Sequence, residues 1–151
     1  MGEKKVTGRK RHLLVDTGGE VLVVVVHSAA LQDRDGAELV FAEAAERYPT
    51  LRKVWSDGSY RGDLEEAVRQ GYGFELEVVR RPAGVGGFVV LARRWVVERT
   101  FGWFGRYRRL SKDYEHLTES SEAWIYLASL HRLLKRLKPD PLAPRPYATA
   151  R

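Results

Sequence analysis

Two apolar runs near the start of the chain indicate a pair of β-strands. The first covers residues 12–16 and the second residues 21–27, and the turn between them contains Gly18 and Gly19. A glycine pair suits a tight hairpin because glycine accepts positive φ angles without steric cost. The second run is apolar up to its last residue, which is typical of a strand covered on both faces. We therefore expect an antiparallel hairpin whose second strand lies inside an α/β sheet.

After the hairpin, the pattern changes to alternating helices and strands. Apolar residues recur at helical spacing after Asp33 or Asp35, either of which could cap the helix, until Pro49 prevents its continuation. The shorter elements that follow are a strand over residues 53–56, a helix over 63–70 and a strand over 74–78. This order of elements predicts the α/β class.

Two longer helices are predicted in the last part of the chain. The first covers residues 88–109, and the second covers residues 121–137. The apolar faces expected on these helices are Val90, Val97, Phe101 and Phe104 in the first, and Ile125, Leu127, Leu130 and Leu134 in the second. Prolines recur from Pro139 onward, so we expect residues 1–138 to form one domain and 139–151 a disordered tail.

The composition is that of a folded protein and excludes several kinds of chemistry. The chain has 151 residues, of which 44% are hydrophobic and 30% charged, and it has no cysteine. The lack of cysteine excludes disulfide frameworks, thiolate zinc sites and cysteine nucleophiles. The longest apolar run is far shorter than the ~20 residues of a membrane helix, and no apolar signal region follows Met1. We expect a cytoplasmic protein without a membrane partner.

The net charge of +6 is concentrated in two segments, residues 3–12 and residues 93–112. The stretch over residues 33–66 between them is acidic. This distribution indicates a polyanionic partner that touches the protein along particular edges. Lysines and arginines that only solvate helix faces would give the same pattern, so the sequence leaves both interpretations open.

The candidates for catalysis are two carboxylates at the ends or edges of elements. Asp57 follows a predicted strand, and ligands of open α/β sheets bind at the carboxyl ends of strands. Glu98 lies beside the Val97 and Phe101 stripe, so we expect it to be half-buried and to face the sheet. The alternatives are a turn or cap role for Asp57 and an ion pair of Glu98 with Arg94, one helical turn away.

Four ordered blocks of the sequence resemble a known family. They are KVTGRKRHLLVD at residues 5–16, WSDGSY at 55–60, RRWVVERTF at 93–101 and RYRRLSKDYE at 106–115. These blocks closely resemble the bacterial insertion-sequence DDE transposases of the IS-five family, and the resemblance covers about residues 4–138. It implies a ribonuclease-H-like mixed sheet flanked by helices, and a reaction in which carboxylate-bound divalent metals cut and rejoin DNA at the ends of a transposable element.

The resemblance also implies roles for individual residues. Asp57, in the block with Tyr60, is similar to the second catalytic aspartate, and Glu98 is similar to the catalytic glutamate, both as ligands of Mg²⁺ or Mn²⁺. The sequence departs from the superfamily pattern at auxiliary positions, where Ser59, Leu91 and Gly105 stand. The residues expected to contact DNA are Lys4, Lys5, Lys10, Arg11, Arg94, Arg106, Arg108, Arg109 and Lys112.

The first catalytic aspartate of the family has no clear counterpart in this sequence. Ribonuclease-H-like sheets have three strands before the first helix, whereas two are predicted here. Asp16 is acidic, yet it ends a strand that runs antiparallel to the strand ending at Asp57, so the two would lie at opposite ends of the sheet. We interpret Asp16 as a turn residue and expect the chain to be the C-terminal portion of a transposase that lacks its first strand. An upstream transposase segment or a second copy is the expected protein partner, and a catalytically inactive DNA-binding remnant is the alternative function.

Overall fold

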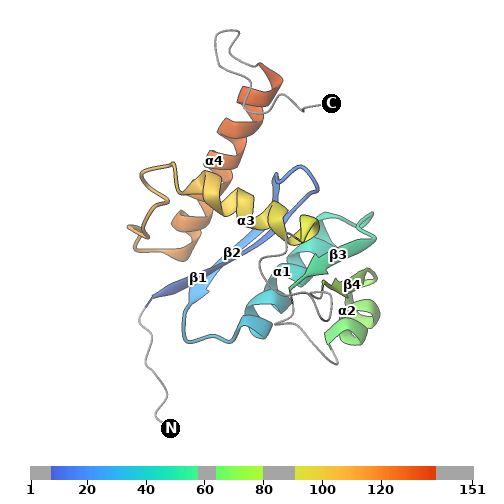
Figure 1. Ribbon diagram of the computed structural model, residues 1–151. Coiled ribbons are helices and arrows are strands. Elements are labelled where there is room, and N and C mark those ends of the chain that lie inside the picture. The colour runs from blue at the N-terminus through green and yellow to red at the C-terminus, as the bar shows by residue number, and fades with distance from the viewer. Residues whose placement is uncertain (1–7, 58–63, 80–90, 139–151) are drawn as a thin grey trace, which may run out of the picture.

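The computed structural model describes residues 8–57, 64–79 and 91–138. Figure 1 shows two small sheets and the helices packed around them. The elements in chain order are β1 (Arg9–Val15), β2 (Val21–Ser28), α1 (Asp33–Arg47), β3 (Lys53–Ser56), α2 (Leu64–Tyr72), β4 (Glu75–Val78), α3 (Ala92–Phe104) and α4 (Thr118–Leu137). The α/β class predicted from the sequence is confirmed, whereas Lys4, Lys5, Ser59, Tyr60 and the proline-rich tail lie outside the described residues.

The first sheet is the predicted hairpin, in which β1 pairs antiparallel with β2. The prediction placed the start of β1 at His12, but the strand begins at Arg9, which pairs with Ser28. Backbone pairing with the longer β2 extends β1 through a basic stretch that has no strand-like side-chain pattern. At the other end of the sheet, the register shifts between Leu14 and Val15.

The helix α1 begins at Asp33 and is followed by Tyr48 and Pro49, as expected from the proline. Neither Asp33 nor Asp35 caps it, because the residue in the cap position is Gln32, which makes no side-chain capping bond. The Asp33 carboxylate instead accepts an ion pair from Lys10 at 2.9 Å. The Asp33 side chain, which the local sequence would assign to a helix cap, is therefore used in an ion pair with a residue of β1.

The second sheet consists of β3 and β4, which run parallel. The bounds of β3 match the predicted residues, and the helix α2 between the strands covers 64–72 in place of 63–70. Phe74, Leu76 and Val78 are buried and the glutamates between them are not, which confirms the predicted alternation.

The strands form two separate two-stranded sheets, where the sequence predicted one mixed sheet. In the described part of the chain, β1 and β3 each pair along one edge only. The outer edge of β2 is covered by α4. The backbone N–H groups of Val24 and Val26 donate to Tyr126 Oη at 3.2 Å and to Glu122 Oε1 at 2.8 Å. The hairpin thus has one edge that is blocked by side chains and one that is not.

The two faces of the hairpin carry two buried clusters. On one face, Val23 packs with residues of α1, α2, β3 and β4. On the opposite face, Val24 and Val26 pack with Phe104, Leu110 and Ile125. The expectation that β2 is covered on both faces is confirmed.

The helix α3 ends at Phe104, five residues before the predicted end, and the predicted residues 88–90 lie outside the described ones. After Gly105 the chain continues in tight turns, with Leu110 N–H donating to Tyr107 O at 2.9 Å. These turns bury Leu110 against the hairpin. A continuous helix would carry Leu110 away from it. Phe101, predicted on the buried face of α3, is 40% exposed, so that part of the prediction is wrong.

The helix α4 exists as predicted, but its buried side was predicted wrongly. Only Ile125 of the four expected residues is buried, whereas Leu127, Leu130 and Leu134 are 50–54% exposed. The buried face consists of Ser121, Ile125, Ala128 and Ser129. Small side chains let α4 approach β2 closely enough to bond its edge. Among the helices in the described ranges, none is long and apolar enough to cross a membrane.

Candidate functional site

Asp57 lies directly after β3 and is partly buried. The pairing of β3 with β4 extends to Ser56, which lies opposite Val78. The helix α1 connects β2 to β3, so β3 starts at the end of the fold where the hairpin turn lies and runs away from it (Figure 1). Asp57 is therefore at the end of its sheet opposite to the β1–β2 turn.

Glu98 lies on α3, and its side chain is 57% exposed. The expectation of a half-buried carboxylate facing the sheet is wrong, because the residue of α3 that packs most tightly against the hairpin is Thr100, which is fully buried. The Glu98 carboxylate lies 3.6 Å from the Arg94 guanidinium. The ion pair considered from the sequence is thus present, and Glu98 remains accessible from solvent.

The beginning of α3 is attached to the sheet that carries Asp57. The Arg93 guanidinium lies over the Trp55 ring, 4.3 Å from its centroid, and 3.7 Å from Glu77. Trp55 Nε1 donates to the same Glu77 carboxylate at 3.2 Å. A cation between an aromatic face and a carboxylate fixes the helix to both strands of the sheet. These contacts attach the first turn of α3, rather than Glu98 itself, to the strand that Asp57 follows.

The second half of α3 is attached to the β1–β2 turn. Thr100 Oγ1 donates to Gly19 O at 3.0 Å, and Arg99 donates to Gly18 O at 3.2 Å. Gly19 has a φ of +85°, and a Cβ there would lie 2.8 Å from Thr100 Oγ1. Glycine is required at this position both by the backbone angle and by the closeness of α3. The helix therefore spans from one sheet to the other.

Asp16 is a turn residue in the structure. Its Oδ1 accepts the backbone N–H groups of Gly18 at 2.8 Å and of Glu20 at 2.9 Å, and its own N–H donates to Glu20 O. An aspartate that bonds the next backbone amides stabilises a turn. Within the described ranges, no three His, Asp or Glu side chains lie together in a way that could hold a metal ion.

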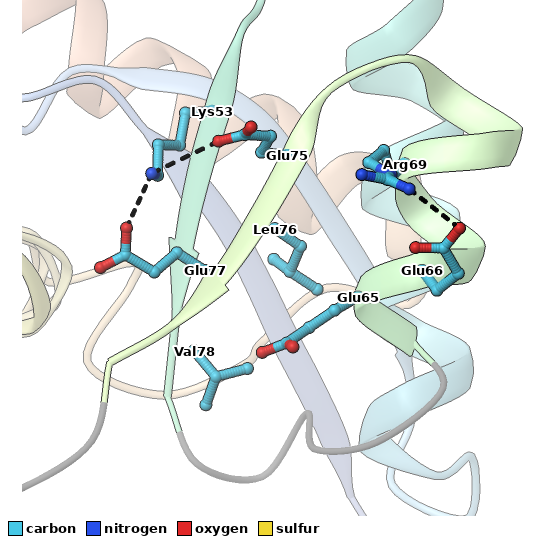
Figure 2. Close-up of a pocket in the computed structure, with 8 residues that line it drawn as sticks. All are labelled: Lys53, Glu65, Glu66, Arg69, Glu75, Leu76, Glu77 and Val78. Carbon is cyan, nitrogen blue, oxygen red and sulfur yellow. Dashed lines mark hydrogen bonds and ion pairs between the residues drawn. The ribbon is translucent and has the colours of Figure 1, made fainter.

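An open hollow of about 510 Å³ lies between β4 and α2 and is also lined by Lys53 of β3. Figure 2 shows Lys53 between Glu75 and Glu77, and Arg69 beside Glu66. The hydrogen bond from Lys53 lowers the pKa of Glu77. Neither Asp57 nor Glu98 lines this hollow. Its glutamates would repel a polyanion, so it is not a site for nucleic acid.

Four of the cations expected to contact DNA have partners inside the protein. Lys10 donates to Leu31 O at 2.8 Å in addition to its ion pair with Asp33, and Arg11 donates to Leu110 O at 3.0 Å. The other two are Arg94, paired with Glu98, and Arg109, which bonds Glu115 and lies 4.9 Å from the centroid of the Trp124 ring. Their charges are partly used within the fold.

Three of the expected cations are exposed and make no side-chain contact of this kind with other described residues. These are Arg106, Arg108 and Lys112, in the turns between α3 and α4. Their closeness in the chain follows from the sequence, whereas their freedom from partners is a property of the tertiary structure.

The sequence analysis did not single out Arg9, which is the cation that organises those turns. Its guanidinium donates to the carbonyl oxygens of Glu115 and His116 and lies 3.3 Å from Asp113. The contacts join residues more than 100 positions apart, so no local pattern could indicate them. Arg9 holds the loop from which Arg106, Arg108 and Lys112 project.

The structure also brings together two histidines, His12 and His27. Their positions in the sequence do not have the spacing of metal ligands, so the sequence did not indicate this pair. The rings of His12 and His27 stack with centroids 4.8 Å apart. Both rings pack against Gly36 of α1, where a Cβ would lie 2.3 Å from His27 Nε2 and 2.6 Å from His12 Nε2. Burial, followed by the charge of His27, lowers the pKa of His12.

Comparison with known proteins places the chain in a family. Residues 2–133 match the family described as transposase DDE domain. The chain is 24% identical over 131 residues to a protein of Burkholderia cepacia described as a putative transposase for insertion sequence element IS402. The match covers 80% of this chain and 60% of that relative, so the chain spans less than two thirds of the relative's length. No solved structure matches the chain. Because the family match extends over most of its residues, the chain belongs to the transposase DDE domain family.

Proposed function

We propose that this chain is the catalytic portion of an insertion-sequence transposase of the IS-five type, which cuts DNA strands at the ends of the element and joins them to a target. The observation that carries the proposal is the family match over residues 2–133, combined with the attachment of α3 to the strand that ends at Asp57. Asp57 and Glu98 are the proposed catalytic residues. They come from elements that contact each other, although 40 positions of the chain separate them.

The proposed metal is Mg²⁺ or Mn²⁺, and the donor set suits it. Both residues are carboxylates, which are the hard oxygen ligands that these ions take, and the chain has no cysteine to favour a softer metal. When bound, the metals would activate the attacking oxygen and stabilise the leaving one. Arg94 forms an ion pair with the Glu98 carboxylate, so a metal bound to Glu98 would share this carboxylate with the arginine or displace it.

A third carboxylate is expected from outside the described residues, on a strand between β1 and β3. The edges of β1 and β3 carry no paired strand in the described ranges, while the other edge of the hairpin is blocked by α4. Two-stranded sheets are marginal by themselves, and α3 contacts a strand of each sheet, β1 and β3. An added strand in that position would join them into one five-stranded mixed sheet of the ribonuclease-H-like kind.

The metal proposal can be tested on the chain by itself. Titration with Mn²⁺ should broaden the amide NMR signals around Asp57 and Glu98 most strongly, since a paramagnetic ion acts on nearby nuclei. Asp57→Asn and Glu98→Gln should each weaken that broadening. Glu46→Gln, an exposed carboxylate on α1, is the matched control and should leave it unchanged. Broadening centred on Asp16, or on the glutamates of the hollow in Figure 2, would contradict the proposed ligands.

The catalytic proposal predicts that a polypeptide supplying the missing strand restores cutting of element-end DNA with Mg²⁺. In the restored protein, Asp57→Ala or Glu98→Ala should abolish nicking, whereas Asp16→Ala should not. Without the third carboxylate, the chain alone should be inactive, because each ~1.4 kcal/mol of lost transition-state stabilisation costs a tenfold decrease in rate. Nicking by residues 1–151 alone, lost on Asp16→Ala, would make Asp16 the missing ligand.

The second candidate is a protein that binds DNA without cutting it, and the exposed Arg106, Arg108 and Lys112 favour this function. The logarithm of the binding constant should fall linearly with the logarithm of the salt concentration, with a slope of about −0.9 for each phosphate that the protein neutralises. Replacing the three residues by alanine should decrease that slope, while Arg34→Ala with Arg52→Ala, which removes exposed arginines elsewhere, should change it little. Binding with this salt dependence but no cutting in the restored protein would favour the second candidate.

A further inference from the structure

The two halves of the connection between α3 and α4 are held in different ways. We call residues 105–117 the α3–α4 loop, which Figure 1 shows at the edge of the molecule. The first half makes its own backbone turns, in which Tyr107 O accepts from Leu110 N–H at 2.9 Å and from Ser111 N–H at 3.1 Å. Among the described residues, no backbone-to-backbone hydrogen bond of this kind involves residues 112–116. The second half therefore depends on side chains.

Arg9, at the start of β1, is the side chain that holds the second half. Its guanidinium donates to the carbonyl oxygens of Glu115 and His116 and to Ser121 Oγ of α4, and it lies 3.3 Å from Asp113. Ser121 Oγ in turn donates to Asp113 Oδ1 at 2.8 Å. A guanidinium can bond several acceptors at once because its five N–H donors form a rigid planar fork, whereas a lysine has a single nitrogen.

The charges of the α3–α4 loop are sorted by these contacts. Its two carboxylates are turned inward, where Asp113 pairs with Arg9 and Glu115 with Arg109, and they are only 24% and 16% exposed. The cations on its outer side are Arg106, Arg108 and Lys112, all of which are exposed. The carboxylates that would repel a phosphate are thus held away from the surface that the free cations form.

We propose that Arg9 is a positioning residue for DNA binding by the α3–α4 loop. It does not touch the DNA, but it holds the loop in the shape that presents Arg106, Arg108 and Lys112 to the phosphates. The inference rests on DNA as the partner, as proposed above. A loop that is already ordered binds without a further loss of conformational freedom, whereas a loose loop must be ordered when the DNA binds.

Arg11 provides a comparison on the same face of β1, two positions further along the strand. It makes a single bond to the loop, from its guanidinium to Leu110 O at 3.0 Å. Leu110 is buried and is also held by its own backbone turn. A lysine can make one such bond, so Arg11→Lys should leave the loop in place. Arg11→Lys is therefore the matched control for Arg9→Lys.

Replacement of Arg9 by lysine tests the proposal, because lysine keeps the charge and loses the fork. Fluorescence anisotropy measures binding of the full chain to a fluorescein-labelled DNA duplex of arbitrary sequence, over a range of salt concentrations. Arg9→Lys should bind roughly fivefold to tenfold more weakly than the wild type, since ordering even one loop residue on binding has a cost of this size. Its salt dependence should not change, because the same phosphates are contacted. Arg11→Lys should bind like the wild type.

Asp113→Asn separates positioning from charge. It removes a negative charge near the DNA, so electrostatics alone predicts tighter binding. The asparagine no longer forms the ion pair with Arg9, and we therefore expect weaker binding, as for Arg9→Lys. Glu46→Gln removes an exposed carboxylate of α1 and is the control for the loss of charge, which should not weaken binding. Tighter binding by Asp113→Asn would overturn the proposal.

Hydrogen exchange measures whether the loop itself is loosened. The Glu115 N–H donates to Asp113 Oδ1 at 3.2 Å, and it should exchange faster in Arg9→Lys than in the wild type. The N–H groups of Val24 and Val26, which bond α4 at the hairpin, should keep their rates and so establish that the fold is intact. Unchanged exchange at Glu115 would contradict the role of Arg9 in holding the loop.

Failure of this inference can be distinguished from failure of the loop as a DNA surface. Alanine at Arg106, Arg108 and Lys112 together should decrease the salt dependence of DNA binding. If it does, while Arg9→Lys binds like the wild type, the positioning role of Arg9 is overturned and the DNA surface stands. If the three alanines leave binding and its salt dependence unchanged, the loop is not a DNA surface, and the inference about Arg9 is overturned with it.

Discussion

The β1–β2 hairpin and the β3–β4 sheet are held in different ways. The hairpin has strands of 7 and 8 residues, buried clusters on both faces and a turn bonded to α3 and α4. The strands β3 and β4 have 4 residues each, and their polar side chains form exposed pairs such as Lys53 with Glu75 and Glu77. Exposed ion pairs add little stability. The comparison indicates that the hairpin stabilises the fold, while the short sheet presents the proposed catalytic Asp57.

The two aspartates that follow strands show the same difference. The Asp16 carboxylate accepts two backbone amides inside its own turn. Asp57 ends a strand that lies against α3, the helix that carries Glu98. The same residue type after a strand therefore stabilises a turn in one sheet, while in the other it follows the strand that contacts the helix of Glu98.

The largest expected effect comes from two glycines with positive φ, one in each region. Gly19 in the hairpin turn has a φ of +85°, and an added Cβ would lie 2.8 Å from Thr100 Oγ1 and 3.0 Å from Trp103. Gly73, just before β4, has a φ of +77° and no atom within 4 Å of an added Cβ. Gly73→Ala should cost only the backbone strain, roughly 1–2 kcal/mol of unfolding free energy. Gly19→Ala should cost that plus the steric conflict, about 3 kcal/mol in total. Urea unfolding measures both, and equal losses would contradict the tight docking of α3 on the turn.

A smaller effect is expected from two glycines inside helices. Gly36 of α1 packs against the rings of His12 and His27, and Gly71 of α2 has no atom within 4 Å of an added Cβ. Gly36→Ala should destabilise the protein by roughly 1–3 kcal/mol, because the rings must move. Gly71→Ala should stabilise it by about 0.5–1 kcal/mol, since alanine is the better helix former. Thermal unfolding reports both, and stabilisation by Gly36→Ala would show that the imidazoles do not press on α1.

The smallest expected effect is a pH dependence that comes from His12 of the hairpin. Burial and then the charge of His27 lower the pKa of His12 below 6.5, and Lys10 lowers it further while Asp33 opposes the shift. The unfolded chain therefore takes up a proton on this histidine at a higher pH than the folded protein. The His12 contribution to stability is complete above about pH 6.5 and is lost as the pH falls below it.

Replacing the histidine isolates this contribution. The unfolding free energy of His12→Gln should fall less between pH 7 and pH 5 than that of the wild type. His116→Gln, which removes an exposed histidine, is the control and should retain the wild-type slope. A slope that is unchanged in His12→Gln would assign the pH dependence to other groups.

Local patterns in the sequence were sufficient for much of the fold. The bounds of β3, the burial of Phe74, Leu76 and Val78, and the coverage of β2 on both faces all match the prediction. These features depend on residues that are close in the chain, where side-chain alternation directly reflects which face is buried. The family was also within reach of the sequence, since its motifs are contiguous blocks.

The tertiary structure alone decided which side of each helix is used. In α4 the leucines have the stronger apolar pattern, yet the face of small and polar residues is buried, because only that face can approach β2 and satisfy its edge N–H groups. In α3 the buried residues include Thr100, which bonds the hairpin turn, and Glu98 is left in solvent. The tertiary structure also decides which cations have partners within the described residues. Arg9 and Arg11, for example, bond residues that lie about 100 positions away in the chain. Periodicity in a sequence shows that a helix has an apolar side, but the partner that it packs against, and the hydrogen bonds that this partner needs, determine which side becomes the core.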